Sequence, residues 1–216
     1  INYRLRGTAR QAKSDSFSSQ VDMELAKIGL SGVVYYSQNV PLLVWSMLFR
    51  VNAAERVHVS AAQAEAYTGL LLIAGLTQNQ RLVTLYRRLS RKAIEKSGSV
   101  SRQVQYLHID GVVDFISCEW ERSAQSLELS MQLASQIGDS RAFATAAASR
   151  GCTLFLQGKY RNSFSVWGDL HERIAKKDVA QAPAWALLGQ GISQLMLGEI
   201  STTLAKLEAS LALLHK

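Results

Sequence analysis

The residues best suited to chemistry are gathered in one predicted helix, which contains His108, Asp110, Asp114 and Cys118. Asp110 and Asp114 are four residues apart, so they share a helix face and could together assist a metal ion. Carboxylates at this spacing are more commonly exposed helix charges, which is what we expect here, and Asp110 could pair with a neighbouring repeat. Cys118 and Cys152 are expected to be small core residues. We therefore predict no catalytic residues and no metal ligands.

A glycine-rich segment at Gly189-Gln190-Gly191 superficially resembles a phosphate-binding loop. A dinucleotide fingerprint needs a third glycine and a preceding strand, and this segment has neither. The phosphate-binding motif G-x-x-x-x-G-K-[ST] is also absent from the sequence. We accordingly expect no bound cofactor.

A cluster of cations lies at Arg87, Arg88, Arg91 and Lys92. Arg87 and Arg91 are four residues apart and could present two guanidinium groups to a carboxylate or phosphate. With Trp120, which lies at a predicted turn, these cations are the candidate partner-binding residues.

The alternative for this cluster is that its helix is rotated, so that the cations face solvent. The helix would then be shifted by about two residues relative to its counterparts, and its buried stripe would be Leu82, Leu85, Leu89 and Ala93.

The elements that position these residues repeat along the chain. Five turn-like dipeptides stand 40 residues apart, at Asn39-Val40, Asn79-Gln80, Glu119-Trp120, Lys159-Tyr160 and Glu199-Ile200. Apolar or small residues recur at fixed offsets from these turns, which is typical of helical hairpins that stack to bury a shared core. The structural repeat positions that stand out are Gly111, Gly151, Gly191, Tyr160 and Trp167.

The predicted fold is all-α: a right-handed α-solenoid of about five antiparallel helix pairs. The small residues of the first helices favour a tetratricopeptide-like repeat with a 40-residue period, and a HEAT-like or armadillo-like solenoid is the alternative. A basic, Ser-rich leader or linker is expected at residues 1–19, followed by the repeat domain at 20–216. The expected repeats are 20–58, 60–97, 100–138, 140–177 and 179–216.

Composition narrows the class further. The 216 residues include only two Pro and two Cys, which favours long helices and excludes a disulfide scaffold. No apolar run is long enough to span a bilayer, so we expect an intracellular, cytoplasmic protein.

The net charge of +7 comes entirely from residues 1–100. RNA-reading repeats place polar base contacts in every unit, and no such column recurs here, so nucleic-acid binding is not the expected function.

Several short segments resemble a known family. They are NAAER at 52–56, AEAY at 64–67, IGDSR at 137–141, QGKY at 157–160, WGDL at 167–170 and WALLGQG at 185–191. Together they resemble the C-terminal helical-repeat region of multidomain class III adenylate/guanylate cyclases that also carry an AAA-type ATPase module. The resemblance covers most of residues 20–216 and implies a regulatory or scaffolding part of a larger signalling protein. It brings no catalytic residues with it.

The expected function is therefore a non-catalytic scaffold for protein–protein interaction and regulation, in a fragment that begins at Ile1. One alternative is the regulatory C-terminal region of a class III nucleotide cyclase whose catalytic domain lies outside this chain. A second is a basic repeat protein that contacts RNA. A terminal repeat normally carries a polar cap, and the last helix shows little sign of one. We therefore expect that the solenoid continues, docks on another subunit or pairs with itself through this helix. Its apolar stripe is Leu204, Leu207, Leu211 and Leu214.

Overall fold

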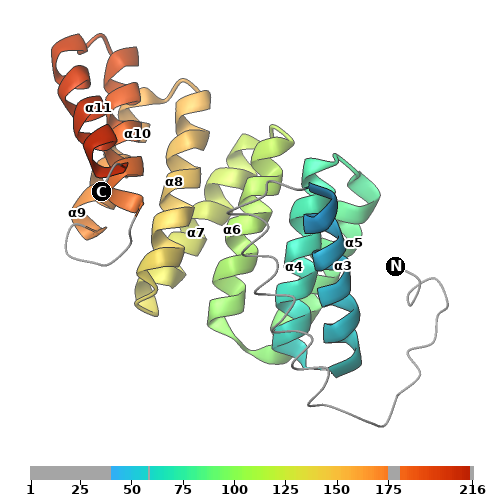
Figure 1. Ribbon diagram of the computed structural model, residues 1–216. Coiled ribbons are helices and arrows are strands. Elements are labelled where there is room, and N and C mark those ends of the chain that lie inside the picture. Colours follow the sequence, from blue (N-terminus) through green and yellow to red (C-terminus); the bar gives the residue numbers. More distant parts are fainter. Residues whose placement is uncertain (1–39, 58, 175–180, 215–216) are drawn as a thin grey trace. The chain divides into compact units, whose positions relative to one another are not determined.

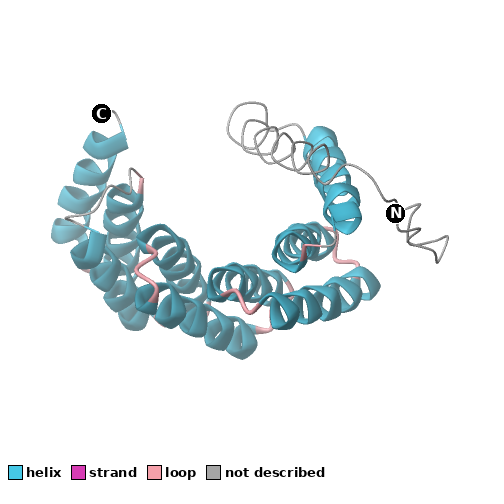
Figure 2. Cartoon of the chain, turned by 90° about the horizontal axis from the view of Figure 1, so that it is seen from below, coloured by secondary structure: helices cyan, strands magenta, loops and turns pink. Residues whose placement is uncertain are grey.

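The computed structural model describes residues 40–57, 59–174 and 181–214. In this part of the chain every regular element is an α-helix, and short turns join most of the consecutive helices (Figures 1 and 2). The all-α prediction is confirmed. The leader at 1–19 and the first helix expected in the repeat at 20–58 lie outside the described residues.

The chain divides into two compact units, residues 1–102 and 103–216. The first contains α3 (Val40–Val57), α4 (Ser60–Leu76), α5 (Gln80–Ser97) and the first residues of α6 (Val100–Ile116). Within this unit α4 packs against both α3 and α5.

The second unit contains the rest of α6 and five further helices, of which the first two are α7 (Trp120–Gln136) and α8 (Ser140–Leu156). The last three are α9 (Tyr160–Ile174), α10 (Ala182–Met196) and α11 (Ile200–Leu214). From α7 onward each helix packs against the one that follows it. None of the described helices combines the length and the hydrophobicity that a bilayer crossing requires.

Local signals set the helix boundaries. The side chains of Asn79 and Asp139 accept hydrogen bonds from Leu82 N and Ala142 N, and so cap the first turns of α5 and α8. Pro183 lies in the first turn of α10, where its missing N–H breaks no helical hydrogen bond. Four turns end in a glycine with positive φ, a conformation that is strained for other residues. These are Gly98, Gly138, Gly158 and Gly198.

The helix boundaries recur at a fixed distance. The second helix of each hairpin begins at Gln80, Trp120, Tyr160 or Ile200, in steps of 40 residues. The contacts between helices recur with the same step. A Cβ at Gly111 would meet Leu127, one at Gly151 would meet Trp167, and one at Gly191 would meet Leu207.

Buried hydroxyls join helices at recurring positions in the second unit. Ser163 Oγ donates to Gly151 O at 2.9 Å, and Thr203 Oγ1 donates to Gly191 O at 3.4 Å. Ser210 Oγ donates in the same way to Ala184 O at 2.9 Å. Each bond gives a buried hydroxyl a backbone acceptor on another helix, so these small polar residues pack between helices without the cost of an unpaired polar group.

The alternative in which the α5 cations face solvent is supported for Arg88, Arg91 and Lys92, which are exposed, although α5 buries only part of the stripe expected for it. Its buried residues are Val83, Tyr86, Ser90 and Ala93, whereas Leu82 is exposed. Val83 and Ser90 stand 40 residues before Ser123 and Ser130, which are fully buried in α7. Arg91, however, is exposed where Met131 of α7 is buried, and Tyr86 is buried where Ser126 is half-buried. The buried face of α5 therefore matches that of α7 only in part.

Candidate functional site

A groove in the second unit lies between α7, α8 and α9 and has a volume of about 420 Å³. We call it the α7–α9 groove. Its lining combines apolar, amide, carboxylate and guanidinium groups. The lining residues are Glu128, Met131, Gln132, Ser135, Gln136, Phe143, Arg150, Asp169 and Arg173.

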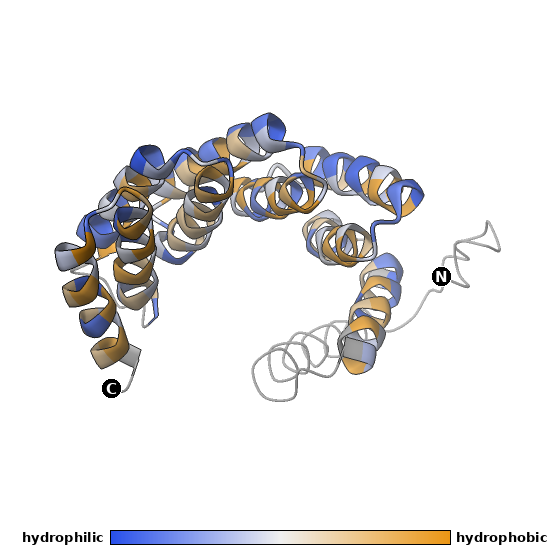
Figure 3. Ribbon diagram, turned by 90° about the horizontal axis from the view of Figure 1, so that it is seen from above, coloured by the Kyte–Doolittle hydropathy of each residue, from blue (hydrophilic) through white to orange (hydrophobic). Residues whose placement is uncertain are grey.

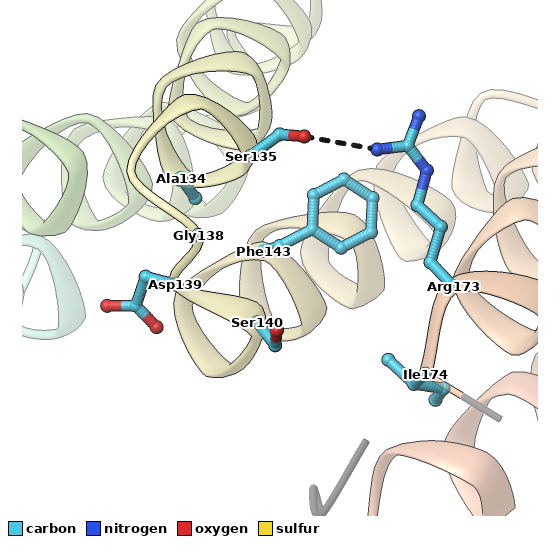
Figure 4. Close-up of a pocket in the computed structure, with 8 residues that line it drawn as sticks. All are labelled: Ala134, Ser135, Gly138, Asp139, Ser140, Phe143, Arg173 and Ile174. Atoms are coloured by element: carbon cyan, nitrogen blue, oxygen red, sulfur yellow. Dashed lines mark hydrogen bonds between the residues drawn. The ribbon is translucent and has the colours of Figure 1, made fainter. Parts of the chain in front are cut away.

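A smaller pocket of about 120 Å³ adjoins the groove at the turn between α7 and α8. The two cavities share Ser135, Phe143 and Arg173, so these residues form the wall between them. Figure 4 shows the Phe143 ring and Ser135 on the same side of the Arg173 guanidinium, with a dashed line marking the hydrogen bond to Ser135.

Arg173 comes from the last turn of α9 and reaches across to α7 and α8. Its guanidinium lies 4.8 Å from the centre of the Phe143 ring, and Nη1 donates to Ser135 Oγ at 3.3 Å. Asp169 lies one turn earlier on the same helix, but within the described chain Arg173 forms no ion pair with it or with any other carboxylate. Arg173 is therefore a positioned cation that has no ion-pair partner among the described residues.

Arg150 is the second cation of the groove and is already paired. Its Nη2 lies 2.7 Å from Glu128 Oε2, and its side chain is 27% exposed. Glu128 Oε1 also accepts from Gln132 Nε2 at 3.3 Å. The Nε of Arg150 is buried and has no hydrogen-bond partner in the structure, so this donor is left unsatisfied.

This arrangement is suited to recognition. An apolar floor of Met131 and Phe143 can accept an apolar side chain, while the unpaired charge of Arg173 can bind a carboxylate by charge-assisted hydrogen bonds. Partner anchors of this kind, apolar and guanidinium groups side by side, dominate binding at protein interfaces.

The side chains that the sequence singled out as suited to chemistry lie outside the groove, elsewhere in the second unit. Asp110 and Asp114 were expected to be exposed, and that is wrong, because they are 3% and 2% exposed. Asp110 accepts from the Tyr106 hydroxyl at 2.9 Å, and Asp114 lies 3.5 Å from Arg122 Nη2. Burial of a carboxylate is tolerated when donors of this kind satisfy it.

His108 is packed between helices rather than presented to a ligand. Its Nε2 lies 3.0 Å from Ser149 Oγ of α8, and burial lowers its pKa to about 4. Among the described residues, no three groups that could ligate a metal lie close enough to form a site.

The two cysteines were expected in the core, and that is also wrong. Cys118 and Cys152 are both exposed and both are free thiols. Cys118 occupies the turn between α6 and α7 with a φ of 59°. Desolvation by neighbouring atoms raises the pKa of the Cys152 thiol, so the surroundings do not favour the thiolate that a nucleophile needs.

The cations of α5 lie in the first unit. Arg88, Arg91 and Lys92 are exposed and Arg87 is half-buried. Arg87 and Arg91 each already have an interaction partner in the structure, so their role in partner binding stays a prediction.

Trp120 packs edge-on against Phe115 with ring centres 5.8 Å apart, at the point where α6 meets α7. Forty residues later Tyr160 packs against Phe155 at 5.3 Å. Both rings are half-buried and close the turn of a hairpin. The structure therefore gives Trp120 the same packing contact as Tyr160, and its role as a partner anchor is untested.

Sequence reasoning did not identify Phe143, Arg150 or Arg173. The sequence did contain one indication of Arg150. The residues 40 positions before and after it, Asp110 and Gln190, are also polar, so the same repeat position is polar in three consecutive repeats. Arg173 gave no such signal, because its significance depends on the neighbouring helices that it touches.

No model of a known protein family matches this chain. A search among curated proteins found no significant match either. The resemblance to the repeat region of nucleotide cyclases therefore stays a prediction from short motifs.

Proposed function

We propose that this chain is a protein-interaction and regulatory module that binds a segment of a partner protein in the α7–α9 groove. The proposed architecture is a right-handed, tetratricopeptide-like solenoid with a 40-residue period. What supports it is the common step of the helix starts, the glycine contacts and the buried hydroxyl bonds.

The single observation that carries the proposed function is the state of Arg173. A guanidinium that is stacked on an aromatic ring and held by one neutral hydroxyl keeps most of its donors for a ligand. The segment that fits has a carboxylate for Arg173 and an adjacent apolar side chain for the floor beside Phe143. Recognition by several weak contacts along a groove is typical of regulatory scaffolds.

The proposal also concerns the larger protein of which this chain would be a part. A signalling protein in which this module regulates a separate activity, such as nucleotide cyclisation, is supported only by the motif resemblance. The neutral charge balance of residues 101–216 gives no support to RNA as the ligand of the groove.

The test is selection of peptides from a random library displayed on phage, followed by affinity measurement with the synthetic peptides. We expect the selected peptides to share an acidic residue next to an apolar one. The Arg173→Gln variant is expected to weaken their binding by about tenfold or more, because a charge-assisted hydrogen bond contributes about 1.5–3 kcal/mol.

Arg161→Gln is the matched control, since Arg161 is an exposed arginine of the same helix outside the groove. Equal affinities for the two variants would contradict the proposal, as would selected peptides without acidic residues. Loss of binding in Phe143→Leu, with the helix content unchanged, would show that the apolar floor contributes as well.

A further inference from the structure

The last helix of the second unit presents an uncovered apolar face. Ile200, Leu204 and Leu211 of α11 are 70%, 60% and 57% exposed. Leu207, in the middle of the same face, is half-buried because it packs on Gly191 of α10. Figure 3 shows hydrophobic (orange) segments along the helix that leads to the label C. Contiguous apolar side chains exposed on one face of a helix are typical of an interaction site.

The corresponding face of α9 is covered. Forty residues before this stripe stand Tyr160, Phe164, Trp167 and His171, all of them half-buried or buried. Trp167 is covered by α10, since a Cβ at Gly189 would lie only 2.6 Å from its Cγ. Thus the face of α11 continues an interface that the fold forms elsewhere, and the group that fits it is another helix.

The spacing of the stripe indicates which helix. Ile200, Leu204, Leu207 and Leu211 are separated by steps of four, three and four residues, which is the spacing of a coiled-coil seam. Leu214, which the sequence places in the same stripe, has a side chain outside the described residues. The other four positions read the same in both directions, so the seam that they form is complementary to an antiparallel copy of itself. In that pairing Ile200 of one copy faces Leu211 of the other, and Leu204 faces Leu207. A two-fold interface requires this kind of self-complementarity.

Charge does not oppose the pairing. The only charged residues of α11 are Lys206 and Glu208. Lys206 is directed toward α10 and α9, because its Nζ donates to Gln190 Oε1 at 3.1 Å and lies 5.6 Å from the centre of the Phe164 ring. Two copies can therefore approach without bringing like charges into direct contact along the seam.

We propose that α11 pairs with α11 of a second copy of this chain, antiparallel and about a two-fold axis, to form a homodimer. The pairing is independent of the α7–α9 groove, which lies on other helices, so either proposal can fail without the other.

Sedimentation velocity of the whole chain over a range of concentrations tests the pairing. A reductant is present because the exposed thiols of Cys118 and Cys152 could otherwise crosslink two copies. The expected result is a reversible monomer–dimer equilibrium. Leu204→Glu is expected to raise the dimer dissociation constant at least about 100-fold, because each dimer loses two buried leucines.

Leu156→Glu is the matched control, since Leu156 is 59% exposed on α8 and lies outside the stripe. Leu211→Glu tests the end of the seam in the same way and is also expected to weaken the dimer. Circular dichroism verifies that the helices persist in all three variants. A chain that stays monomeric at every concentration would overturn the pairing and leave the face to a different protein. A dimer equally tight in the Leu204→Glu, Leu211→Glu and Leu156→Glu variants would overturn it as well.

Discussion

The packing around Trp167 gives the sharpest prediction for this molecule. Gly151 of α8 and Gly189 of α10 lie against the indole ring, which is 4% exposed. A methyl group at Gly151 would lie 2.7 Å from Trp167 Nε1 and closer still to Cε2, whereas ordinary contact begins at 3.4 Å. Gly189 is as close, so the ring has no free space into which to move.

Helix propensity and packing predict opposite signs for Gly151→Ala. Replacing a mid-helix glycine with alanine normally stabilises by about 1 kcal/mol. Forcing an extra methyl group into a well-packed core costs about 1–3 kcal/mol, and more where the neighbour cannot move. Since Trp167 is held from both sides, we expect a net loss of about 2 kcal/mol in the free energy of unfolding.

Urea unfolding followed by far-ultraviolet circular dichroism measures this change. Gly69→Ala is the matched control, because the nearest side-chain atom to a Cβ there is Met47 Sδ at an ordinary 3.8 Å. This control is expected to stabilise its unit by about 0.5–1 kcal/mol. Adding Trp167→Leu to Gly151→Ala should recover part of the loss, with a coupling of about 1 kcal/mol or more. A Gly151→Ala protein as stable as the natural chain would refute the packing argument.

Two further predictions concern buried charge. Because burial lowers the pKa of His108 to about 4, from an ordinary value near 6.5, the unfolded chain binds more protons between these values. Stability is therefore lost as the pH falls, by about 2 kcal/mol between pH 7.5 and pH 5, and this contribution should vanish in His108→Gln. In the first unit, Glu65 pairs with Arg50 and Arg102, so Glu65→Gln is expected to lower the unfolding free energy by about 3 kcal/mol.

Each of these predictions has a direct comparison. For His108, the unfolding free energies of the natural chain and the variant are compared at both pH values, and an unchanged pH dependence would contradict the assignment. For Glu65, the control is Glu95→Gln on the exposed side of α5, which should leave stability unchanged. A Glu65→Gln protein no less stable than this control would show that the ion pairs contribute nothing.

Much of the helical framework followed from sequence alone. The turn glycines, the capping Asn79 and Asp139 and the placement of Pro183 are local signals, and local backbone preferences determine where a helix begins and ends. The 40-residue step was visible because each helix must bury its apolar face at the same offset.

Burial of individual polar residues was less predictable. Asp110 and Asp114 were assigned to the surface and Cys118 and Cys152 to the core, and both assignments were reversed. Residue type predicts burial only on average, because a carboxylate can be buried when a neighbouring helix supplies a donor. Which donor lies opposite is a property of the packed helices.

The candidate site was decided by tertiary structure. The unpaired charge of Arg173 depends on Phe143 and Ser135, which lie at least thirty residues away along the chain. The sequence by itself determined an all-helical chain with a repeated helical step, since these follow from local preference and periodicity. Only the packing of α7, α8 and α9 determined that a cation without a carboxylate partner stands in a groove, because such a charge is defined by its neighbours in space.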